Sequence, residues 1–137
     1  MLVNKNCIIV GASGEIGFNC AKLFYEQGAN LILIYNKNEK IITQFKKEKK
    51  NIVSYKCDLS NEKEIKKIFK KIAGKFPEIN VLVNSAGVME TQNFFLDENL
   101  KNLKKHFDIN ILSAVLLTKL ISRNMIRSQN PSIINIS

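Results

Sequence analysis

The amino-acid sequence predicts an α/β fold: a doubly wound parallel sheet of about five strands with helices on both faces. Short apolar runs alternate with segments of helical period from one end of the chain to the other. The runs are almost continuously apolar, which is typical of strands buried on both faces. No internal repeat, linker or low-complexity segment interrupts this alternation, so we expect residues 1–137 to form one domain.

A glycine-rich turn, Gly11-Ala-Ser-Gly14-Glu-Ile-Gly17, follows the first predicted strand at residues 7–10. Gly11 lets the chain leave the strand sharply, a central glycine lets the backbone approach a phosphate, and Gly17 lets the next helix pack closely. The N–H groups and partial positive charge at that helix N-terminus favour a diphosphate. An ordinary strand–helix turn is the alternative, but the strand and helix around the glycines favour phosphate binding.

The next elements follow from the spacing of apolar residues. Gly28 closes the first helix, and strands are predicted at 31–35 and 52–56. Between these strands, a turn at 36–39 leads into a lysine-rich helix that extends to about residue 50. The predicted buried residues are Ile16, Cys20, Leu23 and Phe24 on the first helix, and Ile41, Ile42 and Phe45 on the second.

A third helix is predicted to begin at Ser60, because serine is a good N-cap and Glu62 and Glu64 suit the first turn. Pro77 ends this helix, and a fourth strand covers residues 79–83. The buried face of the helix is predicted to contain Ile65, Ile68, Phe69, Ile72 and Phe76.

The last part of the chain is predicted to be a connecting segment at 88–99 with a short helical turn, a long helix at about 100–127, and a fifth strand at 132–137. Met89, Phe94 and Phe95 in the connection are compatible with either a substrate pocket or core packing. The helix is expected to place Leu103, Phe107, Asn110, Ala114, Leu117, Ile121 and Met125 on one face or its border.

Four turns follow the carboxyl ends of the first four strands: the glycine turn, Asn36-Lys37, Asp58-Leu59 and the turn 84–87. Ligands of open parallel sheets bind beyond these ends, at the switch point of the strand order. The four turns are therefore predicted to meet at one edge of the sheet and to form a ligand site.

Composition narrows the class of protein. The formal charge is +9, but most lysines lie in helices whose apolar residues keep a separate face, so solvated lysine faces explain the charge better than nucleic-acid binding. Part of the excess would attract an anionic cofactor. The three cysteines match no disulfide framework or metal site, and we expect reduced core residues. No apolar run approaches the roughly 20 residues of a membrane span, and the N-terminus leaves no room for a signal peptide, so we expect a cytoplasmic protein.

Together these motifs resemble the short-chain dehydrogenase/reductase family, with the chain covering only the N-terminal half or so of such a Rossmann-type domain. The glycine turn resembles the family's coenzyme turn, and Asp58-Leu59 the position that contacts adenine. Asn84-Ser-Ala-Gly87 resembles the Asn-Asn-Ala-Gly turn, and Asn110 the helix asparagine that holds backbone and a proton-relay water. The implied coenzyme-binding residues are Gly11, Ala12, Ser13, Gly14, Glu15, Ile16, Gly17, Asn36, Lys37, Asp58, Leu59, Asn84, Ala86 and Gly87.

The sequence departs from the family pattern at several positions. Val10 replaces a threonine, Gly14 comes one residue before the usual middle glycine, and Ser85 replaces an asparagine. Ser137 aligns one residue before the catalytic serine, and is that serine only if the alignment slips by one. The Tyr-x-x-x-Lys motif, whose tyrosine is the family's general acid, is absent. We therefore expect a catalytically incomplete fragment, truncated before the C-terminal strands and helices.

The resemblance implies a nicotinamide coenzyme, and NADP is favoured over NAD. No acid stands at Asn36-Lys37-Asn38, where it would repel a 2′-phosphate, and Lys37 is placed to pair with one. The alternative is that Lys37 is a solvated turn residue. Glu39 lies further along, where it fits the start of the second helix.

The resulting hypothesis is an NADPH-dependent oxidoreductase similar to the 3-oxoacyl-carrier-protein reductases. It would act on a small carbonyl or alcohol, free or bound to a carrier protein, and its full-length form would be a homo-oligomer without metal, nucleic acid or membrane. A non-catalytic dinucleotide-binding or interaction module is the alternative. An in-frame Tyr-x-x-x-Lys motif beyond the last codon would favour the enzyme.

Overall fold

The computed structural model describes residues 1–47, 49–88 and 99–136 and confirms the predicted α/β architecture. Five parallel strands form one sheet in the order β3-β2-β1-β4-β5. The strands are β1 (Asn6–Val10), β2 (Asn30–Tyr35), β3 (Ile52–Lys56), β4 (Val81–Asn84) and β5 (Ser132–Asn135). The helices are α1 (Glu15–Glu26), α2 (Glu39–Lys46), α3 (Glu62–Lys75), α4 (Leu100–Phe107) and α5 (Ser113–Ile126), and a π-helical turn, Asp108–Leu112, joins α4 to α5.

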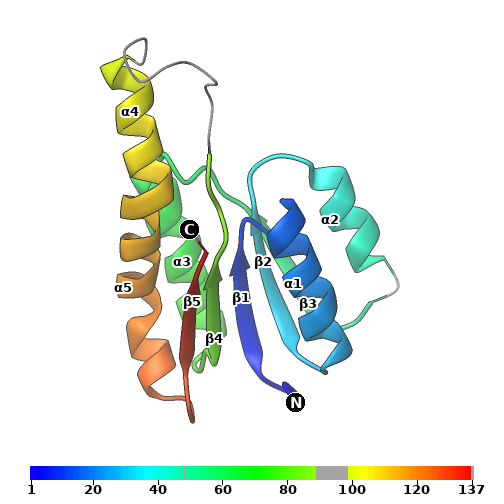
Figure 1. The fold of residues 1–137 in the computed structure, drawn as a ribbon. Coiled ribbons are helices and arrows are strands. Elements are labelled where there is room, and N and C mark those ends of the chain that lie inside the picture. Colours follow the sequence, from blue (N-terminus) through cyan, green and yellow to red (C-terminus); the bar gives the residue numbers. More distant parts are fainter. Residues whose placement is uncertain (48, 89–98, 137) are drawn as a thin grey trace.

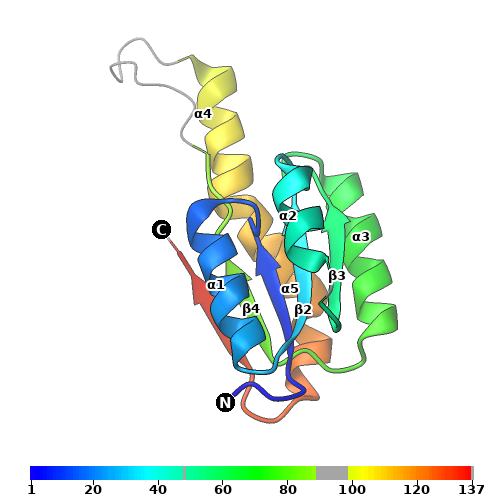
Figure 2. The same cartoon turned by 90° about the vertical axis from the view of Figure 1, so that its right-hand side faces the viewer.

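Helices cover both faces of the sheet, as expected of a doubly wound fold. Figure 1 shows α1 and α2 on one face and α3 and α5 on the other, and Figure 2 shows β5 and β3 at opposite edges. Alternate residues of each strand pack against the helices on opposite faces of the sheet. Ile8 packs with Phe69 and Leu117, whereas Ile9 packs with Ala21. The strands therefore read as continuous apolar runs because both of their faces are buried.

The predicted buried face of α1 is wrong in part. Ile16 is 53% exposed and Leu23 is also exposed, whereas Gly17 and Ala21 face the sheet. A Cβ on Gly17 would overlap the Gly11 carbonyl and lie 2.7 Å from the Ser85 hydroxyl oxygen. Close approach at the glycine turn thus requires small residues on the inner side of the helix and displaces the larger ones outward.

The ends of the next two helices also differ from the prediction. Helix α2 ends at Lys46 instead of residue 50, because the backbone is extended at Lys47. On this helix Ile42 and Phe45 are buried as predicted, but Ile41 is exposed. Asn61 rather than Ser60 caps α3: its side-chain oxygen accepts bonds from the Lys63 and Glu64 amides at 3.1 and 3.2 Å.

The long C-terminal helix is interrupted at Asp108–Leu112 by the π turn. Leu117, Ile121 and Met125 are buried as predicted, but Phe107 is 52% exposed. The extra residue in the π turn rotates α4 relative to α5. A single α-helical period therefore cannot predict the buried faces of both helices. The predicted helical turn in 88–99, with Met89, Phe94 and Phe95, lies largely outside the described residues.

This helix also qualifies the expectation about membranes. Leu100–Ile126 is long and apolar enough to cross a bilayer by length and composition alone. The core helix of a globular domain passes the same test, and here Leu117 and Ile121 are buried in the core cluster that covers one face of the sheet. The finding is therefore weak evidence for a membrane span.

The cysteines have the predicted character of reduced core residues. All three are free thiols; Cys7 and Cys57 are buried and Cys20 is partly buried. Burial raises the pKa of both Cys7 and Cys57 to about 12.

Candidate functional site

The four turns predicted to converge do line one cleft at the carboxyl ends of the strands. Its volume is about 230 Å³. The glycine turn contributes from β1, residues 36–38 from β2, residues 57–59 from β3, and residues 85–88 from β4. The predicted residues that line it are Gly11, Ser13, Gly14, Asn36, Lys37, Asp58, Leu59, Ala86 and Gly87.

The remaining predicted residues lie outside this cleft. Ala12 and Gly17 are buried in the packing of the glycine turn, whereas Glu15 and Ile16 are exposed on the first turn of α1. Asn84 and Asn110 line a neighbouring pocket. Ser137 is outside the described residues.

The glycine turn is fastened to the neighbouring strands by backbone contacts. Gly11 has a φ of +79°, which favours glycine, and a Cβ there would lie 2.7 Å from the Ala86 nitrogen. The Gly11 and Ala12 amides donate to the Ile34 carbonyl at 3.0 and 2.9 Å. The Ser85 hydroxyl donates to the Val10 carbonyl at 2.6 Å. The turn is therefore held rigidly against β2 and β4.

The N-terminus of α1 has the features of an anion site. Gly14 is the N-cap residue, so the cap position itself places no side chain over the first turn and makes no side-chain capping bond. Only the Gly11 carbonyl lies near a Cβ built on Gly14, at 3.3 Å. Amides of a first helical turn have no intrahelical acceptor, and they carry the positive end of the helix dipole. A phosphate group fits this donor set.

The end of β2 brings a cation into the cleft and directs an acid elsewhere. Lys37 lines the cleft, whereas Glu39 lies in the first turn of α2, as the sequence predicted. The Tyr35 hydroxyl donates to Glu39 Oε1 at 3.0 Å. Burial, this hydrogen bond and the Glu39 charge together raise the pKa of Tyr35. The Glu39 carboxylate is thus held by the Tyr35 hydroxyl.

Asp58 supplies a carboxylate of fixed orientation just after β3, the strand next to β2. Its Oδ1 accepts bonds from the Ser60 amide at 2.9 Å and from the Ser60 hydroxyl at 2.8 Å. The Asp58 amide donates to Glu64 Oε1 at 3.2 Å. These bonds tie the turn after β3 to the start of α3.

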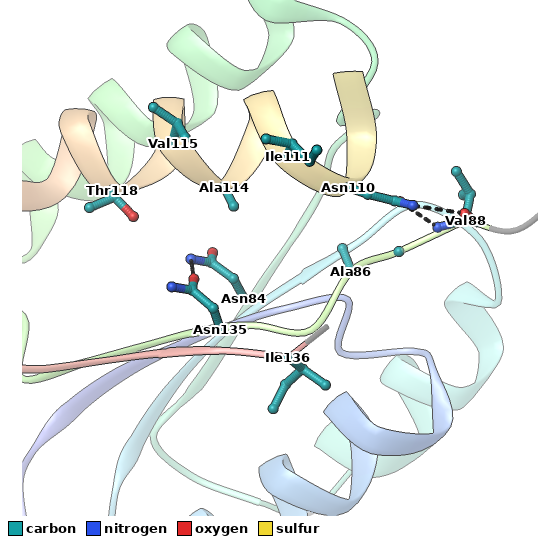
Figure 3. A pocket seen from close by; sticks show the side chains of 11 residues that line it. Asn84, Ala86, Val88, Asn110, Ile111, Ala114, Val115, Thr118, Asn135 and Ile136 are labelled. Atoms are coloured by element: carbon teal, nitrogen blue, oxygen red, sulfur yellow. Dashed lines mark hydrogen bonds between the residues drawn. The ribbon is translucent and has the colours of Figure 1, made fainter. Parts of the chain in front are cut away.

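A second pocket of about 840 Å³ adjoins the cleft and shares Ala86, Gly87 and Val88 with it. Figure 3 shows the Asn110 side chain reaching the backbone of Val88. Asn110 Oδ1 accepts from the Val88 amide at 2.8 Å, and its Nδ2 donates to the Val88 carbonyl at 3.0 Å. The π turn is thereby fastened to the segment after β4, whose residues 86–88 line both cavities.

An asparagine pair lies on the floor of this pocket. Asn84 Nδ2 donates to Asn135 Oδ1 at 2.8 Å, and both side chains point toward α5 in Figure 3. Asn84 is buried, and its Oδ1 has no hydrogen-bond partner among the described residues. Such an orphan acceptor marks a place that suits a hydrogen-bond donor.

The sequence model of the family described as short chain dehydrogenase matches residues 5–137. The chain belongs to this family. Members of the short-chain dehydrogenase family are oxidoreductases that use NAD or NADP and act on small molecules.

Sequence relatives and solved structures agree with this assignment. The chain is 31% identical over 128 residues to Short-chain dehydrogenase reductase 3a of Arabidopsis thaliana, covering 91% of this chain and 49% of that protein. It is similar to ligand-free aldohexose dehydrogenase of Thermoplasma acidophilum, with a TM-score of 0.84, 28% identity, and coverage of 99% and 50%. It also matches 2-keto-3-deoxy-D-gluconate dehydrogenase from Streptococcus agalactiae, with a TM-score of 0.81, 30% identity, and coverage of 99% and 52%. The chain spans about half the length of the relatives it matches.

Two contributors to this short-chain dehydrogenase site were missed by sequence reasoning. Ser85 was seen only as a replacement for an asparagine, yet its hydroxyl joins β4 to the end of β1. Asn135 pairs with Asn84, its register partner on the neighbouring strand. A polar residue within the apolar run Ile133-Ile-Asn-Ile136 was the signal that would have identified it.

Proposed function

We propose that this chain is the coenzyme-binding half of an NADPH-dependent short-chain reductase that acts on a carbonyl substrate. The observation that carries the proposal is the cleft in which four separate turns meet at the carboxyl ends of the strands. Ligands of open parallel sheets bind at this position. When bound, the coenzyme would supply the hydride that reduces the carbonyl.

The coenzyme diphosphate is assigned to the glycine turn. Gly11 and Gly14 place no side chains at the mouth of α1, and the first-turn amides would donate to the phosphate oxygens. Asp58 and Leu59, which line the cleft after β3, are proposed to contact the adenine.

The preference for NADP rests on the charges around Lys37. Its ammonium group is available to a 2′-phosphate at the end of β2. The nearby acid, Glu39, accepts a bond from Tyr35 and does not line the cleft. Asn36 and Asn38 are neutral polar residues, so the turn after β2 brings one positive charge and no negative charge to the cleft.

The catalytic apparatus is assigned in part to this chain. We propose that Asn110 supports the proton relay from its place in the pocket that adjoins the cleft, while Ser137 would act only if the alignment slips by one. The sequence has no Tyr-x-x-x-Lys motif, so these 137 residues are expected to bind coenzyme without turnover.

The substrate proposal is a 3-oxoacyl-type carbonyl compound, free or bound to a carrier protein. We also propose a cytoplasmic location and a homo-oligomeric full-length protein. Exposed apolar side chains on and beside α5, such as Leu112 and Val115, support a self-associating surface.

Calorimetry with NADPH and NADH tests the coenzyme proposal. We expect the chain to bind NADPH, and Lys37→Ala to weaken that binding roughly tenfold with little effect on NADH, since one charge-assisted contact is lost. Lys40→Ala is the matched control, because Lys40 lies on the outer surface of α2. Absence of heat with either coenzyme would refute the proposal, and equal losses for both would refute the NADP preference.

A further inference from the structure

The π turn between α4 and α5 redirects one backbone hydrogen bond. In an α-helix the Ser113 amide would donate to the Ile109 carbonyl, four residues earlier. Here it donates to the Asp108 carbonyl instead. The Ser113 hydroxyl donates to the Ile109 carbonyl at 2.7 Å, and Ser113 is only 4% exposed. The Ser113 hydroxyl therefore replaces the Ser113 amide as the donor to the Ile109 carbonyl, which lies where water has little access.

The same turn decides which way Asn110 points. In an uninterrupted α-helix, residues seven apart lie on the same face, so the buried Leu117 predicts that Asn110 would also face the core. The extra residue rotates the preceding segment by about one residue's share of a helical turn, roughly 100°. Ile109 is consequently the buried residue, whereas Asn110 is exposed and makes two hydrogen bonds to Val88.

We infer that Ser113 is a positioning residue, whose hydroxyl stabilises the π turn and thereby aims Asn110 at the Val88 backbone. Val88 borders both the coenzyme cleft and the adjoining pocket, so the position of Asn110 shapes the wall that they share. The consequence for coenzyme binding rests on the proposed function. The consequence for the Asn110–Val88 bonds does not.

Amide hydrogen exchange of Val88, measured by NMR without coenzyme, tests the inference. Ser113→Ala is expected to speed that exchange roughly tenfold, because the Asn110–Val88 bond is weakened. The amide of Ile9 in the central strand serves as the reference for global unfolding and is expected to stay unchanged. Ser122→Ala is the matched control: its hydroxyl donates to the Lys119 carbonyl at 3.0 Å within the same helix but outside the π turn.

A second pair of variants separates the hydroxyl from side-chain shape. Ser113→Thr keeps the hydroxyl, whereas Ser113→Val has nearly the same shape without it. Slow Val88 exchange in the threonine variant and fast exchange in the valine variant support the inference. Equal exchange in this pair, or an equal rise in Ser122→Ala, overturns it. If the Val88 result holds while NADPH does not bind, the proposed function fails and the positioning role stands.

Discussion

The central strands β1 and β2 and the edge strand β5 differ sharply in how completely their side chains are buried. β1 and β2 are almost entirely buried between α1 and α2 on one face and α3 and α5 on the other. Every residue of β5 is exposed, and Asn84 beside it holds a buried acceptor with no partner among the described residues. The cleft therefore lies at the ends of two fully packed strands, whereas the adjoining pocket is bordered by an exposed strand.

Deletions of equivalent apolar side chains should expose this difference most clearly. Ile32→Ala in β2 removes a fully buried side chain and is expected to lower the free energy of unfolding by about 4 kcal/mol. Ile133→Ala in β5, where the side chain is 44% exposed, is expected to cost under about 1 kcal/mol. Urea unfolding measures both. Similar losses would show that β5 is as well packed as β2.

The glycine turn provides the next test, because it packs closely against the neighbouring segment after β4. Gly17→Ala places a Cβ against the Gly11 carbonyl and the Ser85 hydroxyl, and should lower the free energy of unfolding by about 3 kcal/mol. Gly74→Ala on α3 is the control, since no atom lies within 4 Å of its Cβ, and it should stabilise the protein by up to about 1 kcal/mol. Thermal melting of the two variants would contradict this account if their order were reversed.

The pH dependence of stability at alkaline pH compares the two faces of the sheet, because a cysteine thiol is buried on each face. Burial raises the pKa of Cys7 and Cys57 from 9.0 to about 12, so above pH 9 the unfolded chain loses protons that the folded chain keeps. Stability is full below pH 9 and should fall by about 1.4 kcal/mol per pH unit for each cysteine between pH 9 and 12. Unfolding of Cys7→Ala and Cys57→Ala at pH 8 to 10 should each show a shallower pH slope, and an unchanged slope would argue against buried thiols.

Exposed apolar residues at the β5 edge should affect association more than stability. Ile134→Lys is expected to change the free energy of unfolding by less than about 0.5 kcal/mol, because Ile134 is exposed. A lysine on an edge strand should reduce self-association, which sedimentation velocity measures over a range of concentrations. A monomeric parent chain, or undiminished association of the variant, would contradict this expectation.

Short-range patterns predicted the strands, the order of the elements and the four turns that meet in the cleft. They could do so because a strand buried on both faces needs a continuous apolar run, whatever its neighbours are. The patterns mispredicted burial where a helix packs unusually close to its neighbours or where the hydrogen-bond register of a helix changes. Ile16 is exposed because α1 approaches too closely for a large side chain, and Phe107 is exposed because of the π turn.

The sequence alone determined the parallel sheet and the position of the cleft at its edge, since apolar period, glycines and polar turn residues are local properties of the chain. The tertiary structure alone decided the Asn84–Asn135 pair, the bond between Tyr35 and Glu39, and the rotation of Asn110 toward Val88. These features depend on which strands become neighbours and on one backbone bond that shifts from Ile109 to Asp108. Contacts between distant segments choose among arrangements that the local pattern allows equally.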